Sequence, residues 1–197
     1  MVDLAAIYSR HAQRWHELRR GSRVERSIPE RVAELVPAPT CVLDVGCGSG
    51  EPIARFFVER GDTVTGVDLA LPMLDVAREH LPTLTLHHAD MRGLALGQRF
   101  GVVIAWDSFF HLGCADQRRM FATFREHTAP HGVLLFTSGL REGEGPSGDM
   151  FGDQLFHGSL DTAEYRAWLE RHGYEILLHS LEDPRLDRTV WLARLAR

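Results

Sequence analysis

The most specific chemical pattern in this 197-residue sequence is the stretch CVLDVGCGSG, residues 41–50. An apolar run of the strand type contains Asp44 near its end, and glycines follow at positions 46, 48 and 50. Glycine lets the backbone approach a ligand closely and adopts turn conformations that other residues avoid. A carboxylate here can hold loop amides or a cationic group, whereas it would repel a phosphate. The stretch therefore predicts a strand-to-helix turn that binds a ligand with positive charge.

Two further carboxylates follow the next two candidate strands. Asp68 ends TVTGVD, 18 residues after Gly50, the distance at which an acidic residue can accept two hydrogen bonds from a ribose diol. Asp90 ends LTLHHAD, where we expect an adenine amino group to lie. Ligands of open parallel sheets bind beyond the carboxyl ends of the strands. Three strands that each end in aspartate therefore predict a site for a positively charged nucleoside.

The elements that would position these carboxylates alternate between strands and helices. Short apolar runs predict strands at 41–45, 63–67, 84–88, 100–106, 132–138, 174–180 and 189–195. Amphipathic stretches predict helices at 51–61, 71–81, 115–129 and 161–173. This order predicts an α/β fold, a Rossmann-like doubly wound, mostly parallel seven-stranded sheet with helices on both faces. The last two strands are too close in sequence for a crossover helix, so we expect an antiparallel hairpin at one edge. Residues 139–159 are interpreted as a long loop.

The length of the chain predicts one domain over residues 1–197, with the core in residues 40–197. Two amphipathic segments, 3–20 and 24–35, precede the first strand, and we interpret residues 1–36 as a helical lid or cap. The first segment carries one apolar and aromatic stripe at three- and four-residue steps, which includes Tyr8 and Trp15. Such a helix can cover a flank of the sheet or close the site.

Composition excludes several classes of function. A net charge of -5 and a pI near 6.1 argue against a nucleic-acid partner, which usually binds a basic face. Three cysteines without a C-x-x-C pair suit a reducing cytosol better than disulfides. No segment approaches the roughly 18 apolar residues of a membrane span, so we expect a cytoplasmic protein without a membrane partner. His87 and His88 alternate across a strand, and we expect no metal site.

The sequence resembles the class I S-adenosylmethionine-dependent methyltransferases, specifically bacterial small-molecule enzymes whose substrate is uncharacterised. DVGCGSG matches their D/E-x-G-x-G-x-G motif, and GVDLALPML, HADMRGL and VIAWDSFFHL stand where their later motifs stand. The resemblance covers roughly residues 40–195, including the antiparallel strand that closes the sheet. It implies S-adenosylmethionine as the cofactor and a small-molecule methyl acceptor.

The resemblance also implies roles for individual residues. Asp44 and the loop that follows it would surround the methionine part of the cofactor, Asp68 would bind the ribose, and Leu69 would pack on the adenine. The residues that we expect to contact the cofactor are Tyr8, Trp15, Arg20, Asp44, Gly46, Cys47, Gly48, Asp68, Leu69, Asp90, Met91 and Trp106. Either Arg19 or Arg20 would meet the methionine carboxylate.

A sulfonium methyl donor is already activated, so the protein must mainly align the acceptor, exclude water and remove a proton where the acceptor needs it. Three residues lie in loops that follow predicted strands or in the long segment that could cover the site. They are the candidate bases His111, His157 and Asp107. Of the two histidines, we slightly favour His111.

Two other functions are compatible with a nucleotide-binding sheet. One is a non-catalytic S-adenosylmethionine-binding regulatory protein. The other is an NAD(P)-dependent oxidoreductase, although the fingerprint of that class is G-x-G-x-x-G and position 51 is Glu rather than Gly. The sequence specifies neither the acceptor nor the acceptor atom.

Overall fold

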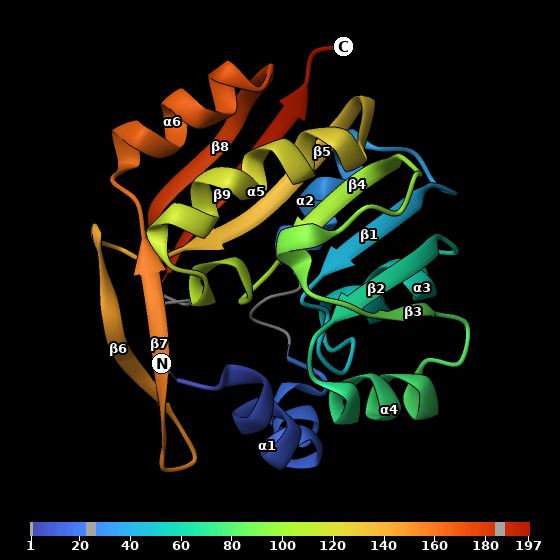
Figure 1. Ribbon diagram of the computed structural model, residues 1–197. Helices are drawn as coiled ribbons and strands as arrows, with labels where there is room; N and C mark the ends of the chain where they lie inside the picture. The colour runs from blue at the N-terminus through green and yellow to red at the C-terminus, as the bar shows by residue number, and fades with distance from the viewer. Residues whose placement is uncertain (1, 23–26, 184–187) are drawn as a thin grey trace.

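The fold was analysed in a computed structural model that describes residues 2–22, 27–183 and 188–197. Helices and strands alternate along most of the chain (Figure 1). In chain order the elements are α1 (Leu4–Arg19), α2 (Ser27–Leu35), β1 (Cys41–Val45), α3 (Ile53–Glu59), β2 (Thr63–Asp68), α4 (Leu71–His80), β3 (Thr85–His88), η1 (Met91–Gly93), β4 (Phe100–Ala105), η2 (Phe109–His111), α5 (Cys114–His127), β5 (Thr128–Ser138), β6 (Gly143–Met150), β7 (Asp153–Ser159), α6 (Thr162–Arg171), β8 (Tyr174–Asp183) and β9 (Arg188–Leu195).

Seven strands form one sheet in the order β3-β2-β1-β4-β5-β9-β8. The first five strands of this order are parallel, and β9 pairs antiparallel with both β5 and β8. The order reverses between β1 and β4, which is the point where open sheets bind ligands. The predicted mostly parallel sheet with an antiparallel edge hairpin is confirmed.

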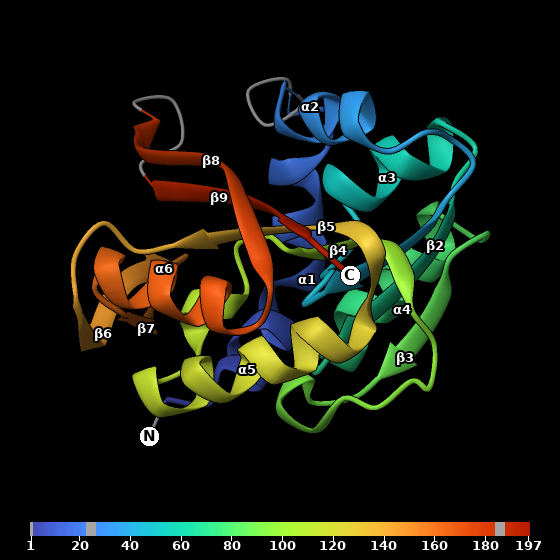
Figure 2. The same cartoon turned by 90° about the horizontal axis from the view of Figure 1, so that it is seen from above.

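Helices cover both faces of this sheet, because most residues of the central strands β1 and β4 are apolar and neighbouring residues point to opposite faces. Val103 packs in a core with α5 and α6, while its neighbours Val102 and Ile104 pack in a second core with α2 and α3. Figure 2 shows these two helical layers on opposite sides of the strands. The carboxyl ends of the central strands are therefore fixed from both sides.

The segment that the sequence analysis interpreted as a loop is instead the antiparallel hairpin of β6 and β7. The loop prediction was wrong because β6 reads GEGPSGDM, which has no alternating apolar residues and is mostly exposed. Backbone pairing, interrupted between Pro146 and Asp149, holds the two strands together. The hairpin forms a small separate sheet at one side of the molecule (Figure 1).

The predicted N-terminal helix is confirmed as α1, which lies between α4 and the hairpin. Asp153 at the start of β7 accepts hydrogen bonds from Arg10 at 2.5 Å and from His11 at 2.7 Å. Arg14 stacks 3.9 Å above the ring of Phe151. Part of the second predicted segment, residues 24–26, lies outside the described residues.

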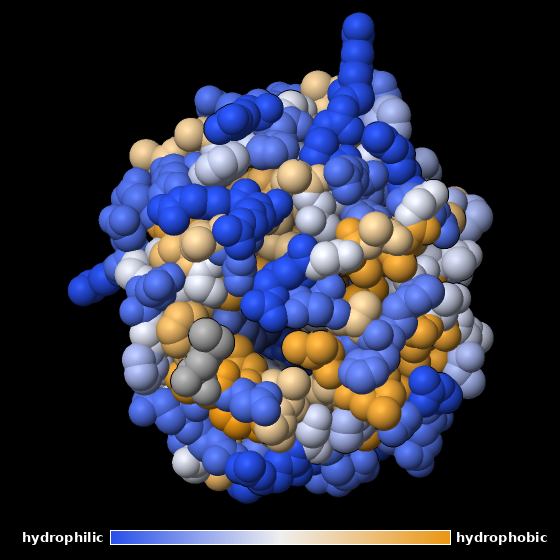
Figure 3. All heavy atoms as spheres, in the orientation of Figure 1, coloured by the Kyte–Doolittle hydropathy of each residue, from blue (hydrophilic) through white to orange (hydrophobic). Residues whose placement is uncertain are grey.

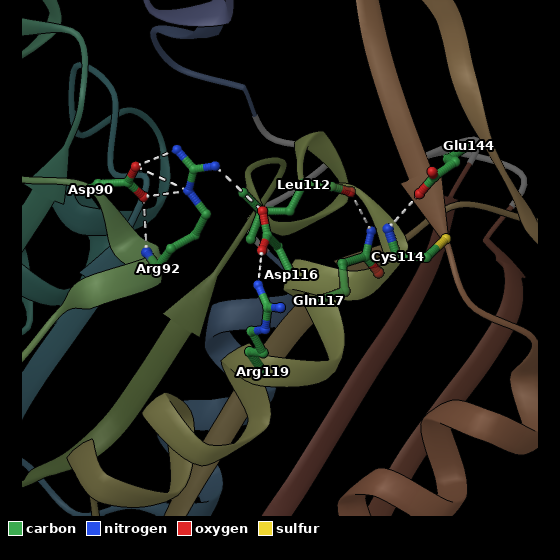
Figure 4. Close-up of polar contacts among 8 residues, drawn as sticks. All are labelled: Asp90, Arg92, Leu112, Cys114, Asp116, Gln117, Arg119 and Glu144. Carbon is green, nitrogen blue, oxygen red and sulfur yellow. Dashed lines mark hydrogen bonds and ion pairs between the residues drawn. The ribbon is translucent and has the colours of Figure 1, made fainter.

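Buried hydrogen bonds join α5 to the elements around it. Gln117 is fully buried and donates to the carbonyl oxygens of Leu112 and Gly158, at 2.9 and 2.8 Å (Figure 4 shows the first). Its side-chain oxygen accepts from the hydroxyl of Tyr165 at 2.6 Å.

In the part of the chain that the structure describes, no helix has the length and apolar character needed to cross a membrane.

Candidate functional site

A cavity of about 600 Å³ lies at the carboxyl ends of β1, β2 and β4, at the point where the strand order reverses. Residues along α1, from Leu4 to Arg19, and two hairpin residues, Glu144 and Phe156, also line it. Figure 3 shows a hollow in this face of the molecule, with hydrophobic side chains beside it and hydrophilic ones above it. The size lies within the usual range for small-molecule sites.

Asp68 connects the turns that follow the first two strands of the chain. Its carboxylate accepts hydrogen bonds from the amides of Gly48 and Ala70, both at 2.8 Å. Burial raises the pKa of Asp68, and these amide bonds oppose the rise. Asp68, the residue predicted to bind a ribose, thus lines the cavity with a carboxylate whose orientation is already fixed.

The amides of the glycine-rich turn donate to atoms of the protein itself. Gly46 and Cys47 donate to the carbonyl oxygen of Val67, at 2.7 and 3.0 Å, and Gly50 donates to that of Cys47 at 2.9 Å. A phosphate-binding turn of a dinucleotide site needs free amides that point at the ligand. The geometry therefore disfavours a dinucleotide pyrophosphate at this turn.

The structure favours glycine at the three positions of the turn for different reasons. A side chain at Gly46 would meet Cβ of Ser108 at 2.3 Å, and one at Gly50 would meet Leu81 at 2.7 Å. At Gly48 the nearest atom is the sulfur of Met73, 4.0 Å away, although φ is +53°. Contacts within the protein require glycine at positions 46 and 50. Of the three, only Gly48 leaves open space for a ligand.

Asp44 is 3% exposed and lines the cavity. Burial, together with the nearby charge of Asp68, raises the pKa of Asp44 to about 7. Burial also raises the pKa of the neighbouring Cys47 thiol, which keeps it neutral. The inner end of the cavity is therefore acidic and poorly hydrated, which favours a ligand with a cationic group.

The residues predicted to contact an adenine lie together at one side of the cavity. Leu69 is 47% exposed, although it is apolar, and it lines the cavity with Asp90 and Met91. The carboxylate of Asp90 accepts three hydrogen bonds from the guanidinium of Arg92, at 2.5 to 3.0 Å, and these bonds lower its pKa. Because Arg92 already binds this carboxylate, a ring amino group would have to share it.

Asp107, which follows β4 and Trp106, forms ion pairs with Arg19 of α1 at 3.1 Å and with Arg188 of β9. Its φ of 50° is unusual for a residue other than glycine, and the hydroxyl of Thr137 accepts its amide at 2.9 Å. Two guanidinium groups therefore bind the same carboxylate. Asp107, one of the three candidate bases, thus lines the cavity and also joins α1 to the sheet.

Tyr8 and His111 form a hydrogen-bonded pair in the cavity. The ring nitrogen Nδ1 of His111 lies 3.0 Å from the carbonyl oxygen of Phe156 and must donate to it, which leaves Nε2 as the acceptor. The Tyr8 hydroxyl lies 2.7 Å from Nε2 and therefore donates. Burial lowers the pKa of His111 to about 4, so the ring is neutral at pH 7.

Two other predicted site residues are not among those that line the cavity. His157 lies beside His111, with ring centres 5.0 Å apart, but it is not among the residues that line the cavity. Arg20 is exposed at the end of α1, whereas Arg19 and Trp15 line the cavity and lie 5.3 Å apart in a cation–π contact. Consecutive residues of a helix point about 100° apart, so Arg19 can face the cavity while its neighbour Arg20 does not.

Several polar cavity residues were missed by the sequence analysis. Glu51 has a side chain that is 1% exposed, with Oε1 bonded to Arg55 at 2.5 Å. Its Oε2 has no hydrogen-bond partner within the described residues. The other missed residues are Asp3, Arg92, Ser108, Asp116 and Glu144. Glu51 follows the glycine motif directly and could have been considered, whereas Glu144 reaches the cavity only because the hairpin folds over it.

Comparison with known proteins agrees with this geometry. Residues 42–132 match the family described as a methyltransferase domain. The chain is 37% identical over 110 residues to dTDP-3-amino-3,4,6-trideoxy-alpha-D-glucopyranose N,N-dimethyltransferase of Streptomyces venezuelae, a match that covers 55% of this chain and 46% of the relative. It is 35% identical over 100 residues to malonyl-[acyl-carrier protein] O-methyltransferase of Salmonella typhimurium, covering 49% of this chain and 38% of the relative.

The crystal structure of Streptomyces venezuelae DesVI aligns with a TM-score of 0.72 at 24% identity, and the alignment covers 100% of both chains. The chain spans less than half the length of the curated relatives that it matches. The resemblance to class I S-adenosylmethionine-dependent methyltransferases is confirmed, as is the Rossmann-like fold.

The raised pKa of Asp44 predicts an unusual pH dependence of stability. The folded protein holds a proton on this carboxyl up to about pH 7, whereas the unfolded chain loses it near its ordinary value of about 4. The free energy of unfolding of the ligand-free protein should therefore fall as pH rises from about 4 to about 7. Asp44→Asn should remove much of this slope and stabilise the protein by about 2–4 kcal/mol at pH 8.

Denaturant unfolding of the wild type and the variant at several pH values measures this difference. The matched control is Asp75→Asn on α4, whose side chain is 60% exposed and should leave the slope unchanged. An equal slope in the wild type and Asp44→Asn would contradict the assignment of the buried proton.

Proposed function

We propose that this chain, which has the fold and glycine motif of the class I S-adenosylmethionine-dependent methyltransferases, transfers a methyl group from S-adenosylmethionine to a small molecule. The observation that carries the proposal is the acidic cavity at the strand-order reversal, whose turn amides are internally bonded. Relatives named as methyltransferases of an amino sugar and of a carrier-bound malonyl group support it over the two alternatives.

The residues present fit the proposed cofactor. Asp68 is fixed in place to accept the ribose hydroxyls, Leu69 offers an apolar surface to the adenine, and the open space at Gly48 admits the ligand. Asp44 and Glu51, whose Oε2 atom is buried without a hydrogen-bond partner among the described residues, both line the cavity and suit a cationic group. When bound, the cofactor supplies an activated methyl group, so the protein needs little further chemistry.

Three residues of α1 complete this proposed arrangement. Tyr8 and Trp15 line the cavity, and Arg19 reaches it while paired with Asp107. Arg19 is the residue of this helix that we propose to face the methionine carboxylate. A covered cavity excludes water from the reacting atoms, and the contacts of α1 with the hairpin hold this helix beside the cavity.

The proton that leaves the acceptor would pass to the Tyr8–His111 pair. The Tyr8 hydroxyl would accept a hydrogen bond from the acceptor and pass its own proton to Nε2 of His111, which is neutral and unprotonated there. His111 is the proposed base, and Tyr8 is the group that touches the acceptor. A positioned base typically contributes about 10²–10⁴-fold to the rate, and the lowered pKa of His111 favours the lower part of this range.

Calorimetric titration with S-adenosylmethionine and with NAD tests the proposed cofactor. The wild type should bind the first and not the second. Asp68→Ala should weaken binding at least about tenfold, since hydrogen bonds to a charged group contribute about 1.5–3 kcal/mol each. Asp75→Ala, an exposed carboxylate on α4, is the matched control. Saturable NAD binding without S-adenosylmethionine binding would overturn the proposal.

Glu51→Gln tests the proposed contact between Glu51 and the cationic group of the cofactor, and it does so without the methyl acceptor. The variant should weaken binding of S-adenosylhomocysteine at least about tenfold, because its ammonium would lose a charged partner. Binding of 5′-methylthioadenosine, which lacks the amino-acid part, should stay unchanged. Glu59→Gln is the control, since Glu59 also lies near Arg55, at 4.0 Å, but is outside the cavity. Equal losses for both ligands would mean that Glu51 acts only through the fold.

His111→Asn should retain cofactor affinity but lower kcat at least about tenfold. Because the pKa of His111 is about 4, wild-type kcat should show no titration of this ring between about pH 5 and pH 8. Transfer of a labelled methyl group to a fraction of metabolites that supports turnover measures both effects. His157→Asn leaves the Tyr8–His111 bond in place and should behave like the wild type. A wild-type kcat in His111→Asn would remove the proposed base.

A further inference from the structure

Charged side chains on η1, α5 and β6 lie near one another (Figure 4), and among them Arg92, Asp116 and Glu144 line the cavity. Arg92 binds both oxygens of Asp90 and also contacts Asp116, at 3.3 Å. Asp116 in turn accepts a hydrogen bond from Arg119 at 3.0 Å. The two positive and two negative charges of this chain of contacts balance one another, so Arg92 has little attraction left for an anionic ligand.

Glu144 lies at a place in the cavity lining where an anion would otherwise bind well. The first amides of a helix attract anions, and α5, 14 residues long, begins here at Cys114. The Oε2 atom of Glu144 accepts the Cys114 amide at 2.6 Å, as Figure 4 shows. That hydrogen bond lowers the pKa of Glu144, so the side chain is ionised at pH 7. A carboxylate of the protein therefore occupies the position that a phosphate oxygen would take.

The remainder of the lining has the same sign of charge. Among the cavity residues that the structure describes, eight are carboxylates and two are arginines. Both arginines already form ion pairs, Arg19 with Asp107 and Arg92 with Asp90. The eight carboxylates are Asp3, Asp44, Glu51, Asp68, Asp90, Asp107, Asp116 and Glu144. An acceptor that brought two phosphate charges into this cavity would be repelled.

On the basis of the proposed function, we propose that the methyl acceptor carries no phosphate and presents a hydrogen-bond donor, an ammonium or a hydroxyl group, to Glu144. Glu144 is then a specificity-determining residue: one oxygen holds the start of α5 and the other faces the acceptor. The acceptor therefore differs in class from the nucleotide-linked sugars in the names of the Streptomyces relatives.

Fractionated metabolites test the charge of the acceptor directly. A metabolite extract is separated on an anion exchanger, and each fraction is incubated with the protein and labelled S-adenosylmethionine. Labelled product should form in the unretained fraction, and a cation exchanger then separates ammonium from hydroxyl acceptors. Labelled product in the anion-retained fraction would overturn the inference while leaving the proposed function intact.

A titration with inorganic pyrophosphate, followed by the amide NMR signals of Gly113 and Cys114, decides the matter even if no acceptor is found. The wild type should show no saturable shift at millimolar concentrations. Glu144→Lys should gain saturable binding, at least about tenfold tighter than any wild-type binding, because the repelling charge becomes attractive. Glu142→Lys, which makes the same charge change two residues away outside the cavity, should not.

Each result of the titration bears on the inference. Saturable pyrophosphate binding to the wild type at these amides would refute it. Failure of Glu144→Lys to bind, with the variant shown to be folded by its S-adenosylmethionine affinity, would show that Glu144 does not control the charge of the ligand. Equal gains in both lysine variants would also refute a specific role for Glu144.

Discussion

The two hydrogen bonds that Asp68 accepts from Gly48 and Ala70 join the first two strand-to-helix turns of the sheet. Parallel strands end at the same edge, so their terminal carboxylates must lie close together in a poorly hydrated region. The pKa of Asp44 rises to about 7 as a result. Amide bonds hold Asp68 in spite of this cost, and the position of the glycine turn depends on it.

Strong hydrophobic periodicity made most of the fold predictable from the sequence. The seven strands and the six helices were visible because their apolar residues repeat with the period of each element. The hairpin of β6 and β7 was not, since GEGPSGDM has no such period and pairs through its backbone. Tertiary contacts with α1, such as those of Asp153, hold that hairpin in place and leave no local signal.

The candidate site divides in the same way. Residues on the sheet edge, such as Asp44 and Asp68, could be predicted because strand ends converge wherever a parallel sheet forms. Residues of α1 depend on the phase of the helix, and for this reason the sequence left Arg19 and Arg20 as alternatives for the methionine carboxylate, of which Arg19 lines the cavity. Glu144 comes from a segment about 100 residues after the glycine turn, and nothing in its local sequence indicates the cavity.

Closure of the cavity and the charge inside it depend on each other. The helix α1 covers a cavity rich in carboxylates, and removing water from these groups raises the free energy of the closed state. Arg19 offsets part of this cost at Asp107. A cationic ligand at Asp44 and Glu51 would offset more, because it would interact with carboxylates that have lost their hydration. The carboxylates that destabilise the empty cavity therefore favour closure around a ligand with positive charge, and they oppose closure around an anion.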